Sequence, residues 1–248
     1  MNTYAGKNIW IIGASSGIGR ALATELSDQG ATLVLSARSE DKLRNLNTDL
    51  GGHHHVLPLD VADFDACTQA AAGIPKSFPQ LDSVIFMSAI YDPPAPLAEM
   101  DIDAAHNIVN INLNGALNVI HAVLPIFNKQ GFGQLALCGS VAGYRGLPNG
   151  QPYSATKAAI INLAESLRAE QKHLDIKVIN PGFVRTPLTD KNKFKMPIII
   201  EAEKAAKIIA RELLTNRFEI HFPKRFTIIL KLLSILPSWL YFKCVPRS

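Results

Sequence analysis

Short apolar runs alternate with segments of helical periodicity along most of this chain of 248 residues. The first run covers residues 8–12. Beyond it, Ile18, Leu22 and Leu26 recur at the spacing of one helix face. Gly30 then stops the pattern, so a strand followed by a helix is predicted at the start of the chain.

Six further apolar runs continue the alternation, with helical stretches between them. They cover residues 31–37, 55–59, 81–87, 134–138, 176–179 and 218–222. Strands separated by helices require crossover connections, which produce a parallel sheet covered by helices on both faces. The predicted fold is therefore a single-domain α/β, doubly wound parallel sheet, Rossmann-like, with about seven strands.

Composition narrows the class of protein. The chain is 48% hydrophobic and 19% charged, which is enough for a large core and excludes disorder. The net charge is only +4, and cations are interleaved with acids through the first 220 residues, so no nucleic-acid partner is expected. The three cysteines are widely spaced, and the polar N-terminus lacks a signal-peptide pattern, so a reducing, cytoplasmic location is expected.

The C-terminal extension, residues 223–248, departs from this composition. Residues 226–245 are mostly apolar, and their longest uncharged stretch, 232–242, is well short of the roughly 20 residues of a membrane-spanning helix. Flanking lysines with Trp239 and Tyr241 suit a helix in a membrane interface. Burial against the substrate cleft or a second subunit explains the composition equally well. Either case favours a lipophilic substrate.

A candidate proton-handling site lies in the second half of the chain. Ser140 precedes the sequence Tyr153-Ser-Ala-Thr-Lys157 by thirteen positions. On a helix predicted over 153–171, Tyr153 and Lys157 leave the same face one turn apart. A free tyrosine has a pKa of roughly 10. A nearby cation favours the phenolate, so Lys157 is expected to bring the pKa of Tyr153 closer to working pH.

A glycine-rich turn follows the first strand. Gly13-Ala-Ser-Ser-Gly17-Ile-Gly19 lies between that strand and the first predicted helix. Glycines let the backbone approach a pyrophosphate, and the helix N-terminus supplies backbone donors and a positive dipole. The turn therefore predicts a dinucleotide site.

The glycine spacing and the order of Ser140, Tyr153 and Lys157 together resemble the short-chain dehydrogenase/reductase family over nearly the whole chain. The resemblance implies a catalytic tetrad completed by Asn112. Tyr153 would exchange a proton with a carbonyl or an alcohol, and Ser140 would bind the substrate oxygen. Lys157 would also bind the nicotinamide ribose, and Asn112 would hold a relay water. The resemblance further implies a homo-oligomer, either a dimer or a tetramer.

The resemblance also implies the cofactor contacts. Asp60 and Val61 match the adenine contact, and Thr186 matches a contact near the nicotinamide. A substrate loop near 187–200 completes a dinucleotide-binding catalytic domain, 1–222. The full set of implied cofactor residues is Gly13, Ser15, Ser16, Gly17, Ile18, Gly19, Arg38, Asp60, Val61, Ala89, Tyr153, Lys157, Pro181, Gly182, Val184 and Thr186.

The end of the second strand indicates the choice of cofactor. Enzymes that use NAD usually carry an acid there, whereas a 2′-phosphate requires a cation. This chain has Ser36-Ala37-Arg38, and the planar fork of Arg38 suits phosphate, so NADP is favoured over NAD. Ser16 argues weakly the other way, because many NADP-preferring relatives have a second basic residue in the glycine turn.

Two features stand outside the family pattern. Phe86-Met87-Ser88-Ala89 replaces the usual Asn-Asn-Ala-Gly, which keeps the last two residues small but removes two asparagine side chains. Residues 53–55 are three consecutive histidines. Neighbouring side chains that enter a strand point to opposite faces, so these histidines cannot converge on one metal ion. We therefore predict a loop and not a metal site.

The leading interpretation is an NADP-dependent oxidoreductase that acts on a carbonyl or secondary alcohol. A non-catalytic NADP-binding regulatory or scaffold protein is the alternative. An NAD-dependent enzyme with a steroid-like or acyl substrate is the third possibility.

Overall fold

The structure is a computed structural model that describes residues 3–93, 95–192 and 194–245. Lys193 in the predicted substrate loop and the last three residues of the predicted extension lie outside the described residues.

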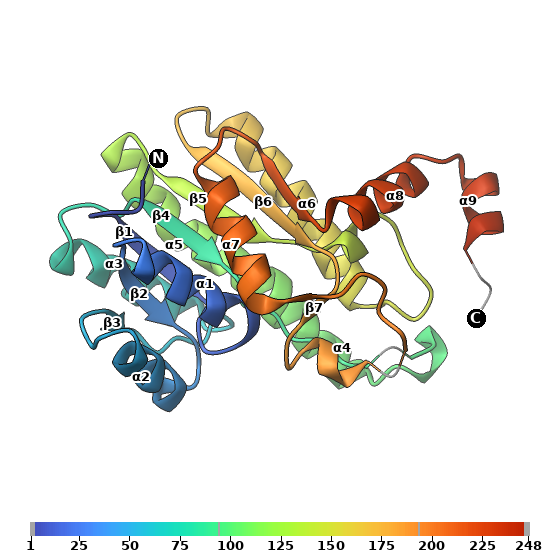
Figure 1. The fold of residues 1–248 in the computed structure, drawn as a ribbon, viewed down its shortest axis with the longest axis horizontal. Helices are drawn as coiled ribbons and strands as arrows, with labels where there is room; N and C mark the ends of the chain where they lie inside the picture. The colour runs from blue at the N-terminus through green and yellow to red at the C-terminus, as the bar shows by residue number, and fades with distance from the viewer. Residues whose placement is uncertain (1–2, 94, 193, 246–248) are drawn as a thin grey trace.

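A seven-stranded parallel sheet forms the centre of the molecule, in the order β3-β2-β1-β4-β5-β6-β9 (Figure 1). This confirms the predicted fold class. The chain starts in the middle of the sheet and changes direction between β1 and β4, where a crevice opens at the carboxyl ends of the strands. The strands are β1 (Asn8–Ile12), β2 (Thr32–Ser36), β3 (His55–Val56), β4 (Ser83–Phe86), β5 (Gln134–Cys138), β6 (Asp175–Pro181) and β9 (Glu219–Phe222).

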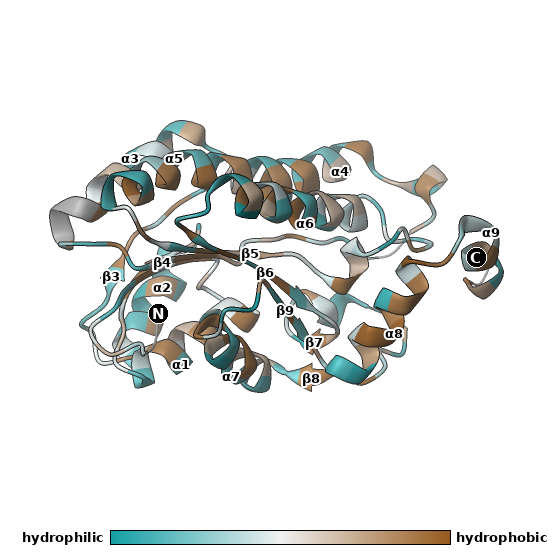
Figure 2. Ribbon diagram, turned by 90° about the horizontal axis from the view of Figure 1, so that it is seen from above, coloured by the Kyte–Doolittle hydropathy of each residue, from teal (hydrophilic) through white to brown (hydrophobic). Residues whose placement is uncertain are grey.

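Helices cover both faces of the sheet (Figure 2). One layer contains α1 (Gly17–Asp28), α2 (Glu40–Asp49) and α7 (Ala202–Leu213). The other contains α3 (Phe64–Ser77), α4 (Ile102–Val109), α5 (Gly115–Gln130) and α6 (Tyr153–Glu170).

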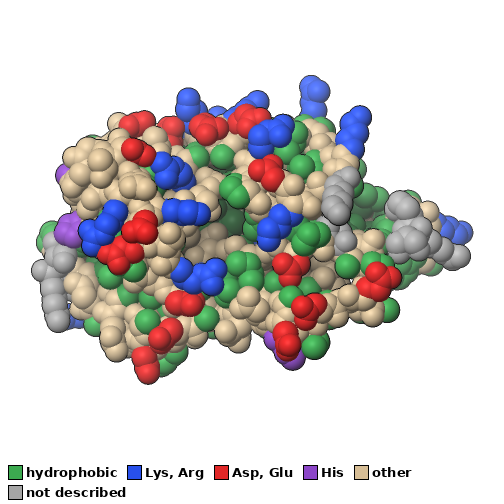
Figure 3. Space-filling model, turned by 90° about the horizontal axis from the view of Figure 1, so that it is seen from below, with side chains coloured by type: hydrophobic (Ala, Val, Ile, Leu, Met, Phe, Trp, Pro, Cys, Tyr) green, Lys and Arg blue, Asp and Glu red, His purple; other side chains and the backbone are tan. Residues whose placement is uncertain are grey.

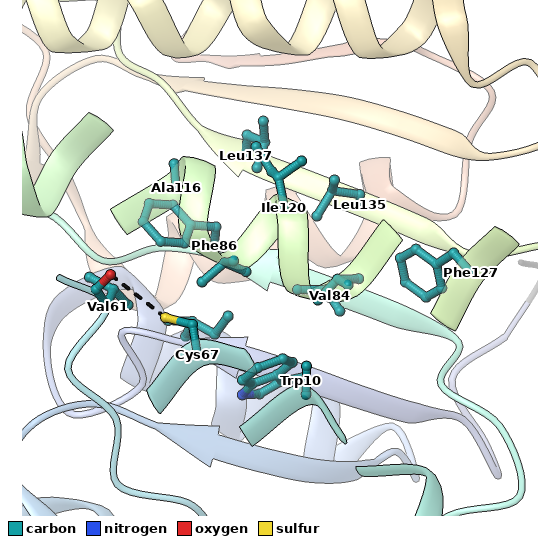
Figure 4. Close-up of a cluster of buried hydrophobic side chains, with 14 of the residues drawn as sticks. Trp10, Val61, Cys67, Val84, Phe86, Ala116, Ile120, Phe127, Leu135 and Leu137 are labelled. Atoms are coloured by element: carbon teal, nitrogen blue, oxygen red, sulfur yellow. Dashed lines mark hydrogen bonds between the residues drawn. The ribbon is translucent and has the colours of Figure 1, made fainter. Parts of the chain in front are cut away.

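The two layers explain why the strands read as continuous apolar runs. Along β1, Trp10 and Ile12 pack into one core while Ile9 and Ile11 pack into the other. All four side chains are fully buried, as expected for a strand covered on both faces. Figure 4 shows Trp10 among the aromatic and aliphatic side chains of the first core. Its indole nitrogen donates a hydrogen bond of 2.9 Å to the Ser36 hydroxyl.

Two differences from the predicted strands go beyond a shift of one or two residues at an end. β3 has only two residues, although Leu57 and Leu59 still donate backbone hydrogen bonds to β2 and to Ala37 beyond it. A separate two-stranded sheet, which was not predicted, joins β7 (Val184–Arg185) and β8 (Ile200–Glu201). This small sheet joins the two ends of the predicted substrate loop.

A continuous helical segment runs from Ile102 to Gln130, with a π-helical turn (Asn110–Asn114) between α4 and α5. By length and composition alone the segment could cross a membrane. Its buried stripe, which includes Ile111, Val119 and Val123, instead belongs to the core between this segment and the sheet. It is therefore a core helix of this fold.

Two short helices follow the last strand: α8 (Lys224–Ser234) and α9 (Ser238–Cys244). They extend away from the sheet at the right of Figure 1. The predicted C-terminal extension is thus largely helical.

Candidate active site

A cavity of about 410 Å³ opens at the carboxyl ends of β1, β4, β5 and β6. The face drawn in Figure 3 is hollowed near its centre. Among the predicted site residues, all but Asn112 line the cavity: Gly13, Ser15, Ser16, Gly17, Ile18, Gly19, Arg38, Asp60, Val61, Ala89, Ser140, Tyr153, Lys157, Pro181, Gly182, Val184 and Thr186. Residues from distant parts of the chain are thus brought together at one site.

The glycine turn after β1 is closed by backbone contacts. Gly13 and Gly17 have φ angles of 96° and 54°, which favour glycine. A Cβ on Gly19 would lie 2.1 Å from the Gly13 carbonyl oxygen, and one on Gly13 would lie 2.6 Å from the Ser88 backbone nitrogen. Ser16 caps α1 without a side-chain hydrogen bond, so the first-turn backbone donors stay available. This donor set fits a pyrophosphate.

The three side chains of the predicted proton site meet at the other end of the cavity. Tyr153 begins α6, and Lys157 follows one turn later on the same helix. The Lys157 nitrogen lies 5.5 Å from the centre of the Tyr153 ring and donates a 2.7 Å hydrogen bond to the Cys138 carbonyl. Ser140 follows β5, and its hydroxyl accepts a 3.1 Å hydrogen bond from the Ala142 backbone.

The pKa of Tyr153 differs from the prediction. Burial raises the pKa of Tyr153 above its ordinary value, and a hydrogen bond with Ser140 acts in the opposite direction. Burial also lowers the pKa of Lys157. The expectation that Lys157 brings down the pKa of Tyr153 is therefore wrong for this geometry. Its ammonium is directed to the Cys138 carbonyl, and desolvation of the phenol has the larger effect.

Asn112 lies in the π-helical turn, fully buried next to the cavity. Its side-chain oxygen accepts a 2.8 Å hydrogen bond from the Ile90 nitrogen, and its amide donates a 3.0 Å bond to the Ile90 oxygen. A further bond of 3.3 Å reaches Thr156. Asn112 thus anchors the segment that lacks the family's two asparagines, while its predicted contact with a relay water stays a prediction.

Lys42 lines the far end of the cavity and was not among the residues predicted from the sequence. Arg38, Ser39 and Lys42 all line the cavity beyond β2. Lys42 belongs to the first turn of α2 and follows Arg38 by four residues. That spacing was a usable signal, because a helix starting after Ser39 turns Lys42 back toward the strand end.

An unpredicted aromatic contact lies beside the proton site. The rings of Tyr91 and Tyr153 meet edge to face, with centres 5.1 Å apart. The Tyr91 hydroxyl donates a 2.8 Å hydrogen bond to Asn192, and Lys191 donates a 2.9 Å bond to the Tyr91 carbonyl. Burial raises the pKa of Tyr91 to about 12. Tyr91 thereby ties the predicted substrate loop to the proton site.

The histidines at 53–55 make structural contacts. The His54 ring accepts a 3.2 Å hydrogen bond from the Leu33 backbone and lies 2.7 Å from the Ser27 hydroxyl. Burial, reinforced by the neighbouring histidines, lowers the pKa of His54 to about 4. Within residues 3–93, 95–192 and 194–245, no group of three or more His, Cys, Asp or Glu side chains could hold a metal ion.

Comparison with known proteins places this geometry in context. A family model described as short chain dehydrogenase matches residues 7–196. A Staphylococcus epidermidis oxidoreductase is 32% identical over 201 residues, which cover 80% of this chain and 87% of that protein. A Myxococcus xanthus oxidoreductase is 29% identical over 236 residues, 93% of each chain.

Two solved structures are similar over most of the chain. An Escherichia coli oxidoreductase aligns with a TM-score of 0.81 and 25% identity, covering 89% of this chain and 96% of that one. A Burkholderia phymatum short chain dehydrogenase/reductase in complex with NAD aligns with a TM-score of 0.86. The alignment covers 100% of this chain and 99% of the other chain. Because the two sequences are only 20% identical, this similarity concerns the fold alone.

Proposed function

The chain belongs to the short-chain dehydrogenase/reductase family, an oxidoreductase family, and we propose that it is an NADP-dependent enzyme acting on a lipophilic carbonyl or secondary alcohol. The observation that carries the proposal is the layout of one cavity. Tyr153, Ser140 and Lys157 converge at one end, and the glycine turn and Arg38 occupy the other.

The roles of the chain's own residues follow from this layout. The nicotinamide cofactor, when bound, supplies or accepts the hydride. In reduction, the Tyr153 phenol donates a proton to the substrate oxygen, and the Ser140 hydroxyl donates a hydrogen bond to the same atom. Lys157 lies one helical turn from Tyr153 and would bind the nicotinamide ribose, as the family resemblance implies. Because burial raises the pKa of Tyr153, the phenol carries its proton at neutral pH and can donate it in reduction.

Two cations support the preference for NADP. Four residues line the cavity at the end of β2: Ala37, Arg38, Ser39 and Lys42. Two of them are cations and none is acidic. A guanidinium and an ammonium together suit a 2′-phosphate, and Lys42 supplies the second cation that the glycine turn lacks.

An aromatic row supports a lipophilic substrate. The Phe183 ring lies 5.8 Å from the Phe194 ring of the predicted substrate loop and 5.5 Å from the Phe226 ring of α8, between centres. Phe183 lies between Gly182 and Val184, both of which line the cavity. The row therefore borders the substrate end with apolar surface.

The proposal extends to the whole chain. We assign residues 1–222 to the catalytic unit of a cytoplasmic homo-oligomer, with the extension as a separate contact surface. The regulatory alternative draws support from the replaced motif Phe86-Met87-Ser88-Ala89, and the complete tetrad argues against it.

Cofactor titration tests the NADP assignment. NADPH should bind the purified protein more tightly than NADH. Arg38→Ser or Lys42→Ala should weaken NADPH binding by roughly ten- to a hundredfold, because each removes a charge-assisted bond, and should leave NADH binding nearly unchanged. Arg44→Ala is the matched control, because Arg44 lies on the same helix and pairs with Glu40. Equal losses for both cofactors would contradict the assignment.

Turnover tests the proton assignment. NADPH oxidation would be followed with a panel of aliphatic, aromatic, steroid and long-chain acyl carbonyls. Tyr153→Phe should lower kcat by roughly 10²–10⁴-fold and leave NADPH affinity nearly intact, because only the proton donor is removed. Retained turnover would rule out Tyr153 as the acid. Tight NADPH binding without turnover on any carbonyl would favour the regulatory alternative.

A further inference from the structure

The two C-terminal helices expose an unusual amount of apolar surface. Six side chains of the extension, on α8, on α9 and in the turn between them, form what we call the tail face. Their exposed fractions range from 48% to 77%, and they are Ile228, Ile229, Leu232, Ile235, Trp239 and Phe242. A surface of this kind normally has a partner.

The tail face does not cover the protein's own cleft. The cleft side of α8 is formed by Phe226, which packs against Phe183 beside the cavity. A Cβ on Gly182, a cavity residue, would lie 3.0 Å from the Phe226 ring. The extension therefore reaches the cleft with one aromatic residue, and the side chains of the tail face stay exposed. Figure 2 shows α8 and α9 at the edge of the molecule.

The charged side chains on the two helices themselves are all cations, of which Lys231 pairs with Glu219 of β9. Four cations lie on the two helices, namely Lys224, Arg225, Lys231 and Lys243, whereas no Asp or Glu occurs after Glu219. The Lys243 nitrogen lies 5.4 Å from the centre of the Trp239 ring. Exposed apolar side chains, aromatic residues and cations without acids complement a surface that is apolar within and anionic at its edge.

Three consecutive residues hold the extension in place, and we call them the clasp: Tyr144, Arg145 and Gly146. They belong to the segment between Ser140 and Tyr153 of the proton site. The Gly146 carbonyl accepts a 2.6 Å hydrogen bond from the Tyr241 hydroxyl of α9.

Arg145 makes the largest number of these contacts. Its guanidinium donates to the backbone oxygens of Ser234 and Leu236, at 3.0 and 2.5 Å, and lies 3.9 Å from the centre of the Tyr241 ring. Tyr144 donates a 2.6 Å hydrogen bond to Glu219, which also pairs with Lys231 of α8. The clasp thereby sets the orientation of the tail face relative to the active site.

We propose that the tail face docks on the surface of an anionic phospholipid bilayer, with α8 and α9 lying in the interface. The helices have 11 and 7 residues, too few to span a bilayer. The inference rests on the proposed function in one respect, because docking would bring the substrate end of a reductase to lipophilic carbonyls held in the membrane.

Vesicle binding by the full-length protein tests the proposal. The protein should co-sediment with vesicles of phosphatidylcholine and phosphatidylserine, and binding should weaken at least tenfold on vesicles of phosphatidylcholine alone or at high salt. The chain has two tryptophans, and Trp10 is fully buried, so a blue shift of tryptophan emission on vesicle addition would report Trp239.

A double variant supplies the decisive comparison. Ile235→Glu with Trp239→Glu should weaken vesicle binding by roughly tenfold or more, because both side chains would leave the interface. Phe132→Glu is the matched control, since Phe132 is 42% exposed in the turn between α5 and β5, outside the extension, and binding should be unchanged.

Several results would overturn the proposal. They are no vesicle binding by the wild type, equal binding by the double variant, or equal binding to neutral and anionic vesicles. Self-association without lipid that the double variant abolishes would assign the tail face to a second copy of the chain. Vesicle binding is measured by co-sedimentation and does not depend on enzymatic turnover. A failure of docking is therefore distinguishable from a failure of the proposed activity.

Discussion

The glycine turn after β1 lines the cavity and the C-terminal extension packs beside it, but different kinds of contact hold the two regions. In the turn, the Gly13 and Ala14 nitrogens donate to the Ser36 carbonyl at 2.7 and 3.1 Å, and backbone passes directly against backbone. In the extension, the fixing contacts come from side chains such as Arg145 and Tyr241. Backbone packing tolerates no added atom, whereas side-chain contacts can be removed one at a time.

The two regions also differ in the source of their charge. The turn offers backbone donors and neutral serines, so its positive potential comes from the helix N-terminus. The extension is fixed to the sheet through a carboxylate, Glu219. Burial would raise the pKa of Glu219, but hydrogen bonds from Lys231, Tyr144 and Asn180 outweigh burial and lower it. Glu219 therefore stays ionised at neutral pH and keeps α8 attached to β9.

The largest predicted effect concerns the glycine turn. Gly19→Ala would place a Cβ 2.1 Å from the Gly13 oxygen, so the backbone of the turn must shift. We expect a loss of about 3 kcal/mol in the free energy of unfolding, typical of overpacking at its upper end, measured by urea denaturation. NADPH binding, measured by fluorescence titration, should weaken at least a hundredfold.

Gly73→Ala is the control for that variant. Gly73 lies in α3 with nothing within 4 Å of a Cβ, so alanine should leave stability unchanged or raise it by up to about 1 kcal/mol. Similar behaviour of the two variants would show that the turn is no more tightly closed than an exposed helix position.

An intermediate effect concerns pH, and it involves two histidines outside the turn and the extension. Burial lowers the pKa of His54, directly before β3, to about 4, and likewise that of His221 in β9, which contacts Thr227 of α8. Because these folded-state pKa values lie below the unfolded value of about 6.5, full stability holds above pH 6.5. Stability should then fall as pH decreases toward 4.

The contribution of His54 can be isolated. His54 is nearly fully buried, and its shift corresponds to at most about 3 kcal/mol lost across that window. Urea denaturation between pH 7 and pH 4 should therefore show a flatter decline for His54→Asn than for the wild type. An unchanged slope would mean that His54 is protonated in the folded protein without cost.

The smallest predicted effect concerns the clasp. Arg145→Ala removes two bonds to backbone oxygens and the contact with Tyr241, but the site is partly exposed, so about 1 kcal/mol of global stability is at stake. The clearer readout is hydrogen exchange, which should accelerate in residues 226–245 and stay unchanged in the glycine turn. Arg20→Ala, which removes an exposed pair with Asp49, should change neither. Unchanged exchange in 226–245 would show that the clasp does not hold the extension.

The sequence predicted the parts of the molecule whose physical requirements are local. β1 and β5 are buried on both faces, so they had to be unbroken apolar runs. The glycine turn and the Tyr153–Lys157 pair each lie within a few residues of chain. The seven strands of the central sheet, and the cavity residues that lie in these two motifs, could therefore be predicted from the sequence.

The remaining features depend on contacts between distant residues. Tyr91 contacts Tyr153 and Asn192, which lie 62 and 101 positions further along the chain. Periodicity in the sequence cannot predict such a contact. The pKa of Tyr153 followed burial, which adjacent residues do not reveal. The clasp likewise joins positions about 90 apart, so the composition of the extension left both of its interpretations open.

The placement of the two tryptophans gives the protein two independent optical reporters. Trp10 lies three residues before Gly13, roughly 10 Å along the strand from the turn. Indole emission overlaps the absorption of reduced nicotinamide, so energy transfer from Trp10 would quench its emission when the cavity fills. Trp239, at the opposite extreme of exposure, responds to solvent polarity. A single emission spectrum can therefore resolve cofactor loading by its intensity and surface contact by its wavelength.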